Sequence, residues 1–229
     1  MGVNDHSESV PTGTPGVDVP DRRGRTGLHL TGRDLTGNPR VLVEDVTLLS
    51  SNWYVTRTTR IRFQHRDGHW STEDRETYDR GNGATILLYD AERRTVLLIR
   101  QFRFPAYVNG HPTGELLEAP AGLLDEDDAE TAIRREAREE TGYAIGEVEP
   151  VFEAYMSPGS VTEKLYFYAA PYEAGDRADA GGGLADEGED IELVELDIDD
   201  ALARIGVDII DAKTIMLLQW AALRGPFAR

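Results

Sequence analysis

Apolar and β-branched residues recur in short runs from residue 41 onward, with polar turns between them. Residues 41–49 and 53–64 are rich in Val, Thr, Ile and aromatic side chains, a composition typical of β-strands. Asp67-Gly68 precedes a further run at residues 75–78, and this dipeptide commonly forms the turn of a hairpin. The pattern predicts antiparallel strands, and we assign residues 39–80 to an N-terminal β-sheet.

Residues 81–229 combine short apolar runs with helical patterns. The runs at 85–89 and 95–99 flank a polar segment, residues 90–94, which predicts a hairpin of buried strands. Strands interspersed with few helices favour a layered α/β (α+β) domain over a helical bundle. Further predicted elements are strands at 150–155, 164–172 and 191–196, and helices at 199–205 and 212–223, the last with Ile215, Leu218 and Ala222 on one face.

One more helix is predicted over residues 127–140. Asp127 can cap its first turn, and Glu130 follows three residues later, as in a capping box. Gly142 then provides a stop signal, because glycine readily adopts the left-handed conformation that ends helices.

Three glutamates of this helix share one face. Glu136, Glu139 and Glu140 lie at positions i, i+3 and i+4, so their carboxylates repel one another. Such a face is usually solvated and paired with neighbouring arginines, here Arg135 and Arg138. The small-residue turn at 121–124, however, can bring a backbone carbonyl beside the acidic face, and oxygen ligands of this kind suit Mg²⁺ or Mn²⁺.

Composition narrows the chemistry. The chain has 229 residues, 40% of them hydrophobic, enough for a sizeable core. It has no cysteine, which excludes disulfides and thiolate metal ligands and is compatible with a reducing cytoplasm. The formal charge of -18 disfavours nucleic acid as a partner. No apolar run approaches the roughly 18 residues of a membrane helix and no export signal is visible, so we expect a soluble, cytoplasmic protein.

Residues 1–38 have a different character. They are rich in Gly, Pro, Asp, Arg and Thr, contain no aromatic residue and show no sustained periodicity of 2 or 3.6. We expect a flexible extension, and the segment shows no helix-turn-helix pattern.

The segment GLLDEDDAETAIRREAREETGY, residues 122–143, resembles the Nudix box. Its helix half is complete, whereas Glu136 lies fourteen residues after Gly122 instead of fifteen, and the first glutamate of the box falls on Asp128. The resemblance implies a Nudix hydrolase domain over residues 81–229, with an α/β/α sandwich around a mixed central sheet. It also implies Mg²⁺, with Mn²⁺ as an alternative, bound by Glu136, Glu140 and the carbonyl oxygen of Ala121, with catalytic support from Glu139.

Stretches outside the box resemble the Nudix branch that hydrolyses GDP-mannose, which also has the shortened box. They are YDRGNGATILLY (78–89), LIRQFR (98–103), MSPGSVTE (156–163), AGGG (180–183) ahead of DIE (190–192), and DAKT (211–214). The resemblance implies substrate contact and a general-base role for Glu163. It implies a further metal ligand at Glu189, with Glu187 as the alternative, unless this acidic loop is merely solvated. Arg103 and Lys213 are candidates to neutralise substrate phosphate, or else surface ion-pair partners.

The branch gathers nucleotide-binding residues from the N-terminal sheet, at positions that match Trp53, Arg75 and Glu76 here. Trp53 could stack on guanine and Glu76 could accept hydrogen bonds from it, although an aromatic residue in a strand more often belongs to a core. In related enzymes this sheet is exchanged across a homodimer. We therefore expect hydrolysis of GDP-mannose to GMP and mannose 1-phosphate, with ADP-ribose hydrolysis and a non-catalytic nucleotide-sugar sensor as alternatives.

Overall fold

The computed structural model describes residues 37–124, 127–173, 175, 177–184 and 188–228, in two compact units. The first unit contains the described residues up to Asn82 together with Ser157–Lys164, and the second contains Gly83–Met156 and the described residues from Leu165 onward. Of the expected extension, 1–38, all but the last two residues lie outside the described part of the chain. No helix among the described residues is long and apolar enough to span a membrane.

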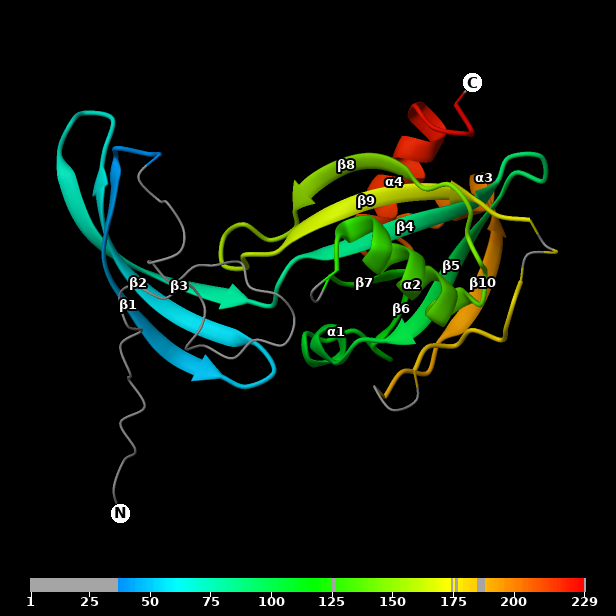
Figure 1. Cartoon of the computed structure of the whole chain (residues 1–229), viewed down its shortest axis with the longest axis horizontal. Helices are drawn as coiled ribbons and strands as arrows, with labels where there is room; N and C mark the ends of the chain where they lie inside the picture. Colours follow the sequence, from blue (N-terminus) through cyan, green and yellow to red (C-terminus); the bar gives the residue numbers. More distant parts are fainter. Residues whose placement is uncertain (1–36, 125–126, 174, 176, 185–187, 229) are drawn as a thin grey trace, which may run out of the picture. The chain divides into compact units, whose positions relative to one another are not determined.

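The first unit is built on a three-stranded antiparallel sheet, ordered β1 (Val41–Ser51), β2 (Val55–Gln64) and β3 (Trp70–Asp79) (Figure 1). The predicted antiparallel strands are confirmed, although the third begins at Trp70 instead of residue 75. Most side chains of the sheet are exposed or half-buried. Val46 and Val55 are its buried apolar side chains.

A buried ion pair ties the end of this sheet to the segment Ser157–Lys164. Arg57 on β2 donates from Nη1 to Asp79 on β3 over 2.8 Å, and both side chains are at most 1% exposed. The Thr162 hydroxyl also donates to the Asp79 carboxylate, over 3.1 Å. The pair therefore joins two strands and a segment that is distant in sequence.

The second unit is a seven-stranded mixed sheet, with path order β10-β5-β4-β9-β8 and with β6 and β7 attached to β5 and β4. Strand β4 runs parallel to β9 and antiparallel to β5. Its strands are β4 (Gly83–Asp90), β5 (Thr95–Phe102), β6 (Glu115–Glu118), β7 (Ala121–Leu123), β8 (Glu149–Tyr155), β9 (Lys164–Pro171) and β10 (Glu192–Asp197).

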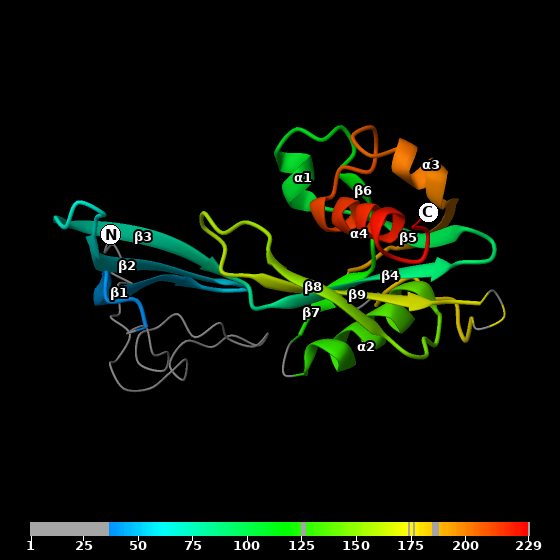
Figure 2. The same ribbon diagram turned by 90° about the horizontal axis from the view of Figure 1, so that it is seen from above.

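Helices cover both faces of this sheet, as the edge-on view in Figure 2 shows. Helix α2 (Ala129–Thr141) lies on one face, while α1 (Phe104–Val108), α3 (Ile198–Ala203) and α4 (Ala212–Leu223) lie on the other. Alternate residues of β4 feed the two cores, because successive side chains of a strand point to opposite faces. Ile86 packs with Ile133 of α2, and Leu87 packs with Leu217 of α4. The predicted α/β/α sandwich is confirmed.

Further details of the second unit differ from the sequence-based expectations. Helix α1 and strand β6 were not expected, because both are too short to show a periodic pattern. The buried face of α4 is also rotated. Its fully buried residues are Thr214, Leu217, Leu218 and Ala221, whereas Ile215 and Ala222 are only half-buried.

The hairpin of β4 and β5 opens to admit β6 and β7. The two strands pair only over residues 88–90 and 95–97, and beyond this β4 pairs with β7 and β5 with β6. Ala119-Pro120 links the inserted strands, and the Pro120 carbonyl accepts hydrogen bonds from the Ile86 amide and the Thr85 hydroxyl, each over 3.0 Å. This insertion places Glu118 and Ala121 inside the sheet.

Candidate active site

Helix α2 is fixed at both ends by its own sequence. The carboxylate of Asp128, the N-cap, accepts hydrogen bonds from the amides of Glu130 (3.1 Å) and Thr131 (3.0 Å) and from the Thr131 hydroxyl (2.7 Å). The expectation that Asp127 caps the helix is wrong, since the helix starts one residue later. Gly142 ends the helix with φ 78°, as predicted.

The capping role also accounts for an aspartate at the position of the first glutamate of the box. A short carboxylate reaches the free amides of its own first turn, and N-cap preferences favour Asp for this reason. Hydrogen bonds from the Thr131 hydroxyl and amide hold the pKa of Asp128 below its ordinary value. Asp128 thus orients the start of the acidic helix.

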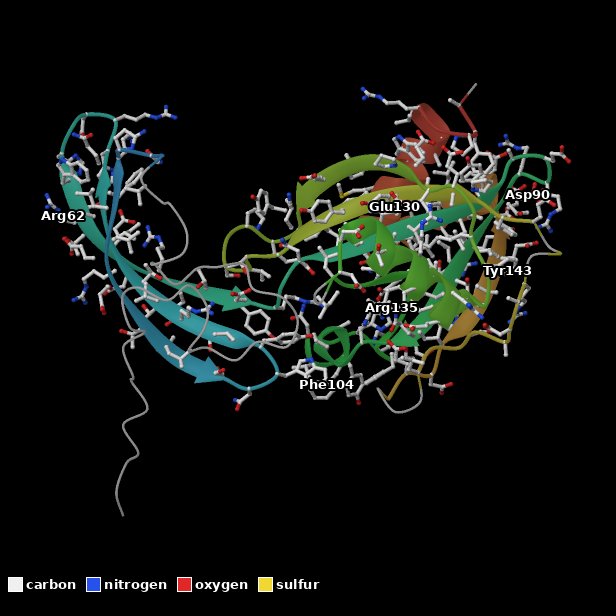
Figure 3. All side chains as sticks on the ribbon, viewed as in Figure 1. Arg62, Asp90, Phe104, Glu130, Arg135 and Tyr143 are labelled. Carbon is white, nitrogen blue, oxygen red and sulfur yellow. The ribbon has the colours of Figure 1, made fainter. Side chains whose placement is uncertain are left out.

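The three glutamates on the acidic face of α2 differ in exposure and partners. Glu140 is only 2% exposed, while the side chains of Glu136 and Glu139 are 15% and 27% exposed. Arg135, labelled on α2 in Figure 3, places Nη1 3.0 Å from the Glu136 carboxylate and 3.2 Å from that of Glu139. Arg138 pairs elsewhere, with Asp179 at 3.3 Å. Arginine pairing therefore covers two of the glutamates and leaves Glu140 to other neighbours.

Strand β7 lies directly against the acidic face. The Ala121 amide donates to Glu140 Oε2 over 3.1 Å. A side chain at Gly122 would overlap the carboxyl group of Glu136, so only glycine lets this carboxyl group approach the strand. As expected for the small-residue segment 121–124, the backbone at residue 121, whose carbonyl oxygen is the predicted ligand, lies beside two of the predicted metal-binding carboxylates.

Electrostatics mark Glu140 as short of positive charge. Burial raises its pKa well above the ordinary value, and the carboxylates of Glu136 and Glu189 raise it further. Arg103 and the Ala121 amide offset only part of this rise. Within the described residues, no three acidic or histidine side chains are already arranged to hold a metal ion. The crowded, oxygen-only donor set nevertheless fits a hard divalent cation, which would relieve this repulsion.

Glu189 reaches this region from a glycine-rich loop. Its Oε2 accepts a hydrogen bond from the Leu184 amide over 2.9 Å. The amides of Gly182 and Gly183 donate to the carbonyls of Glu140 (2.9 Å) and Glu139 (3.0 Å), so the loop caps the last turn of α2. Any side chain at Gly183 would overlap the Glu189 carboxylate. The alternative ligand, Glu187, lies outside the described residues.

Arg103 and Lys213, the two candidate phosphate-binding cations, share a partner that sequence reasoning missed. Arg103 donates through Nε and Nη2 to Glu118, each over 3.0 Å, and Lys213 Nζ lies 2.5 Å from the same carboxylate. Glu118 is 2% exposed. Burial alone would raise its pKa, but Lys213 and Arg103 outweigh burial and lower it to about 2. The one available signal was an acidic residue directly after the apolar pair Leu116-Leu117.

Two of the predicted nucleotide-binding residues lie on β3 and one precedes β2. Trp53 is 66% exposed, so it does not belong to the core of this chain. Arg75 and Glu76 are both exposed and are consecutive on β3. Consecutive strand residues point to opposite faces, so these two side chains do not share a face of the sheet. Arg75 forms an ion pair with Glu73 on its own face.

Glu163, the predicted general base, belongs to the first unit. Its side chain is 12% exposed and lies 3.6 Å from Arg80 Nε. The segment that carries it follows β3 closely, since the Tyr78 amide donates to the Ser160 carbonyl (2.8 Å) and the Thr162 amide donates to the Tyr78 carbonyl (3.1 Å). Arg80 was not anticipated as a partner, because the two residues are far apart in sequence.

Comparisons with known proteins agree with this picture. The family model described as "GDP-mannose pyrophosphatase NudK N-terminal domain" matches residues 40–78, and the model of the NUDIX domain matches residues 79–218. A GDP-mannose pyrophosphatase of Pectobacterium atrosepticum is 52% identical over 183 residues, which cover 80% of this chain and 94% of the relative. One of Citrobacter koseri is 51% identical over 180 residues, which cover 78% and 93%. The chain therefore belongs to the NUDIX family, on the branch that carries the NudK N-terminal domain.

Proposed function

We propose that this chain is a Mg²⁺-dependent hydrolase that cleaves GDP-mannose to GMP and mannose 1-phosphate. The observation that carries the proposal is the surplus of negative charge at buried Glu140, beside Glu136 and Glu189. A buried carboxylate that lacks a cation partner and faces other carboxylates is a characteristic of metal sites. The relatives, about half identical and named GDP-mannose pyrophosphatases, support the substrate.

Each site residue then has a chemical task. Glu136, Glu140, Glu189 and the Ala121 carbonyl would hold Mg²⁺, which when bound neutralises the diphosphate and makes its phosphorus more electrophilic. Arg103 and Lys213 bind the diphosphate oxygens. Glu163 removes a proton from the attacking water, with Glu139 in support, while the P–O–P bond breaks. The hydroxyl group of the water is added to the phosphorus that is attacked, and the proton is left for the phosphate that departs.

The proposal also covers recognition of the guanine base and the oligomeric state of the protein. Trp53 stacks on guanine, and Glu76 accepts hydrogen bonds from its edge, with Arg75 nearby in sequence. We also propose a cytoplasmic homodimer in which the N-terminal sheets are exchanged. The small number of buried apolar side chains in that sheet and the exposure of Leu42, Leu49 and Trp53 support a partner there. Sedimentation of the full chain tests the dimer, and a monomer at micromolar concentration would reject it.

The substrate test compares GDP-mannose with ADP-ribose, each with Mg²⁺, by quantifying the released nucleoside monophosphate. We expect GMP release to be favoured in kcat/KM. A preference for ADP-ribose would replace the substrate assignment but keep the reaction class. Tight binding of GDP-mannose without turnover would instead indicate a sensor.

The role of the acidic helix is tested with Glu136→Gln and a matched control. Loss of a carboxylate that faces the metal should reduce turnover by roughly 100-fold or more. Glu149→Gln removes an exposed carboxylate on β8 and should leave turnover unchanged. Wild-type activity in Glu136→Gln would remove this helix from the mechanism.

A further inference from the structure

The carboxylate of Glu118 stands out because it is inaccessible yet bonded to two cations that reach it from different elements. Glu118 ends β6, Arg103 directly follows β5, and Lys213 lies in the first turn of α4. Oε1 accepts from Arg103 Nε, while Oε2 accepts from Arg103 Nη2 and faces Lys213 Nζ. One carboxylate thus contacts both predicted phosphate-binding side chains.

Exposure within this cluster is graded. The side chains of Glu118, Lys213 and Arg103 are 2%, 12% and 39% exposed. Because Nε and Nη2 are turned toward Glu118, the remaining nitrogen of the guanidinium, Nη1, lies on the edge away from it. Among the described residues Nη1 has no hydrogen-bond partner. The anion is therefore inside the protein, and one donor edge of Arg103 is left for an outside ligand.

Lys213 is held by a second carboxylate. Its Nζ lies 3.1 Å from Asp211, the N-cap of α4. Asp211 also accepts from the Thr214 hydroxyl (2.6 Å), and that hydroxyl oxygen accepts from the Ala119 amide over 2.7 Å. The start of α4 is thereby locked to the residue that follows Glu118. Lys213 can keep its place without Glu118, whereas Arg103 has no equivalent second carboxylate partner in the part of the chain that the structure describes.

Stability alone gives a poor account of such a cluster. Removing charges from water costs several kcal/mol per ion, so a buried ion pair is often no more stabilising than apolar residues of the same volume. A fixed guanidinium, in contrast, benefits a site that binds a diphosphate, because the entropy of ordering a long side chain has already been lost on folding. Arg103 also lies close enough to Glu140 for their charges to interact.

We infer that Glu118 is a positioning residue, which orients Arg103 for the substrate diphosphate without contacting the substrate itself. The inference rests on the proposed function, because it assumes that Arg103 binds diphosphate. Glu118 acts mainly through Arg103 and only weakly through Lys213, which Asp211 also holds.

The test is a double-mutant cycle in the full chain with GDP-mannose and Mg²⁺. Glu118→Gln keeps the shape of the side chain but loses the charge, and we expect kcat/KM to fall about 10- to 100-fold, the size of effect produced by displacing a group in the site by about 1 Å. In an Arg103→Ala background the same change should cost less than about threefold. Equal losses in both backgrounds, or unchanged kcat/KM in folded Glu118→Gln, would overturn the inference.

A matched control and a second substitution exclude simple destabilisation. In the same unit, the Glu195 carboxylate accepts two hydrogen bonds from Arg93, from Nη1 over 2.9 Å and from Nη2 over 2.8 Å. Glu195→Gln disrupts this bidentate pair and should leave kcat/KM unchanged. If Glu118→Gln does not fold, Glu118→Asp replaces it in the cycle. Aspartate retains the charge but moves the carboxylate, so it should give a smaller loss that is again suppressed by Arg103→Ala.

Binding of inorganic pyrophosphate with Mg²⁺, measured by calorimetry, separates failure of this inference from failure of the proposed function. We expect Glu118→Gln to weaken it about tenfold or more, in line with lost ordering of one phosphate-binding cation. A wild-type chain that does not cleave GDP-mannose but shows this weakening would reject only the proposed function. A chain that cleaves GDP-mannose and binds pyrophosphate equally well with and without Glu118→Gln would reject only the inference.

Discussion

Glu118 and Glu140 lie in the same unit and are equally buried, each 2% exposed, but their surroundings are opposite. Glu118 has a guanidinium and an ammonium as direct partners, and these cations bring its pKa down to about 2 despite burial. Glu140 accepts one backbone amide and has no cation as a direct partner among the described residues; burial and the carboxylates of Glu136 and Glu189 raise its pKa more than the charge of Arg103 lowers it. The first carboxylate is compensated within the chain, and the second is not.

This difference separates two uses of a buried charge. A compensated carboxylate can order its cation partners, whereas an uncompensated one stores unfavourable energy that a ligand can release. Such a cost is common at functional sites, where activity and stability conflict. Asp79 in the first unit belongs to the compensated class, since Arg57 is its partner. The comparison can therefore be tested by moving carboxylates from one class to the other.

The largest expected effect comes from depriving Asp79 of its cation. Arg57→Met keeps apolar volume but leaves a buried, unpaired charge, which should destabilise the first unit by about 3–5 kcal/mol. The double variant Arg57→Met with Asp79→Asn should recover part of the lost stability, because the buried charge is then removed as well. Hydrogen exchange of β2 and β3 measures the effect where it arises. Unchanged protection of these strands in Arg57→Met would show that the pair does not hold the sheet.

The opposite change, neutralising Glu140, should stabilise the metal-free protein. Glu140→Gln keeps an acceptor for the Ala121 amide and removes the repulsion, so we expect unfolding in EDTA at pH 8 to become harder by about 1–3 kcal/mol. Activity with Mg²⁺ should fall by roughly 100-fold or more. Glu118→Gln should lower stability under the same conditions. A destabilised Glu140→Gln variant would remove the distinction between the two carboxylates.

The pH dependence of stability should have opposite signs at these two sites. Because the folded pKa of Glu140 is raised, the metal-free chain loses stability as pH rises from about 4.5, the ordinary carboxyl value, through the folded pKa. Because the folded pKa of Glu118 is lowered to about 2, its contribution is present above pH 4.5 and is lost as pH falls toward 2. Melting curves of wild type, Glu140→Gln and Glu118→Gln across pH measure both slopes, of order 1 kcal/mol per pH unit. If the pH dependence attributed to Glu140 or to Glu118 persists when that residue is replaced by Gln, another titratable group causes it.

Local sequence signals predicted one side of this comparison but not the other. Glu136, Glu139 and Glu140 lie within one helix whose spacing and glycine stop are visible in the sequence, so their common face could be inferred. Even there, adjacent Asp127 and Asp128 could not be ranked as caps, because backbone conformation decides between two acidic neighbours.

Glu118 could not be recognised, because its partners are distant in sequence. Arg103 lies 15 residues before it and Lys213 lies 95 residues after it. These elements come together because the β4–β5 hairpin opens and β6 and β7 are inserted between its strands. No periodic pattern in the sequence predicts this insertion. The link between Arg80 and Glu163 was invisible for the same reason. Long-range charge pairing is decided by tertiary packing, whereas helix spacing and capping are decided locally.

The smallest expected effect comes from the exposed counterpart of the Arg57–Asp79 pair. Arg60 and Asp74 lie on the same two strands and form two hydrogen bonds, of 2.9 and 3.2 Å, yet their side chains are 54% and 55% exposed. Water already solvates both charges, so the pair gains little from contact and is screened by salt. Arg60→Ala should leave the protection of β2 and β3 within measurement error. A loss comparable to that of Arg57→Met would mean that cross-strand pairing itself, and not burial, makes a carboxylate depend on its cation.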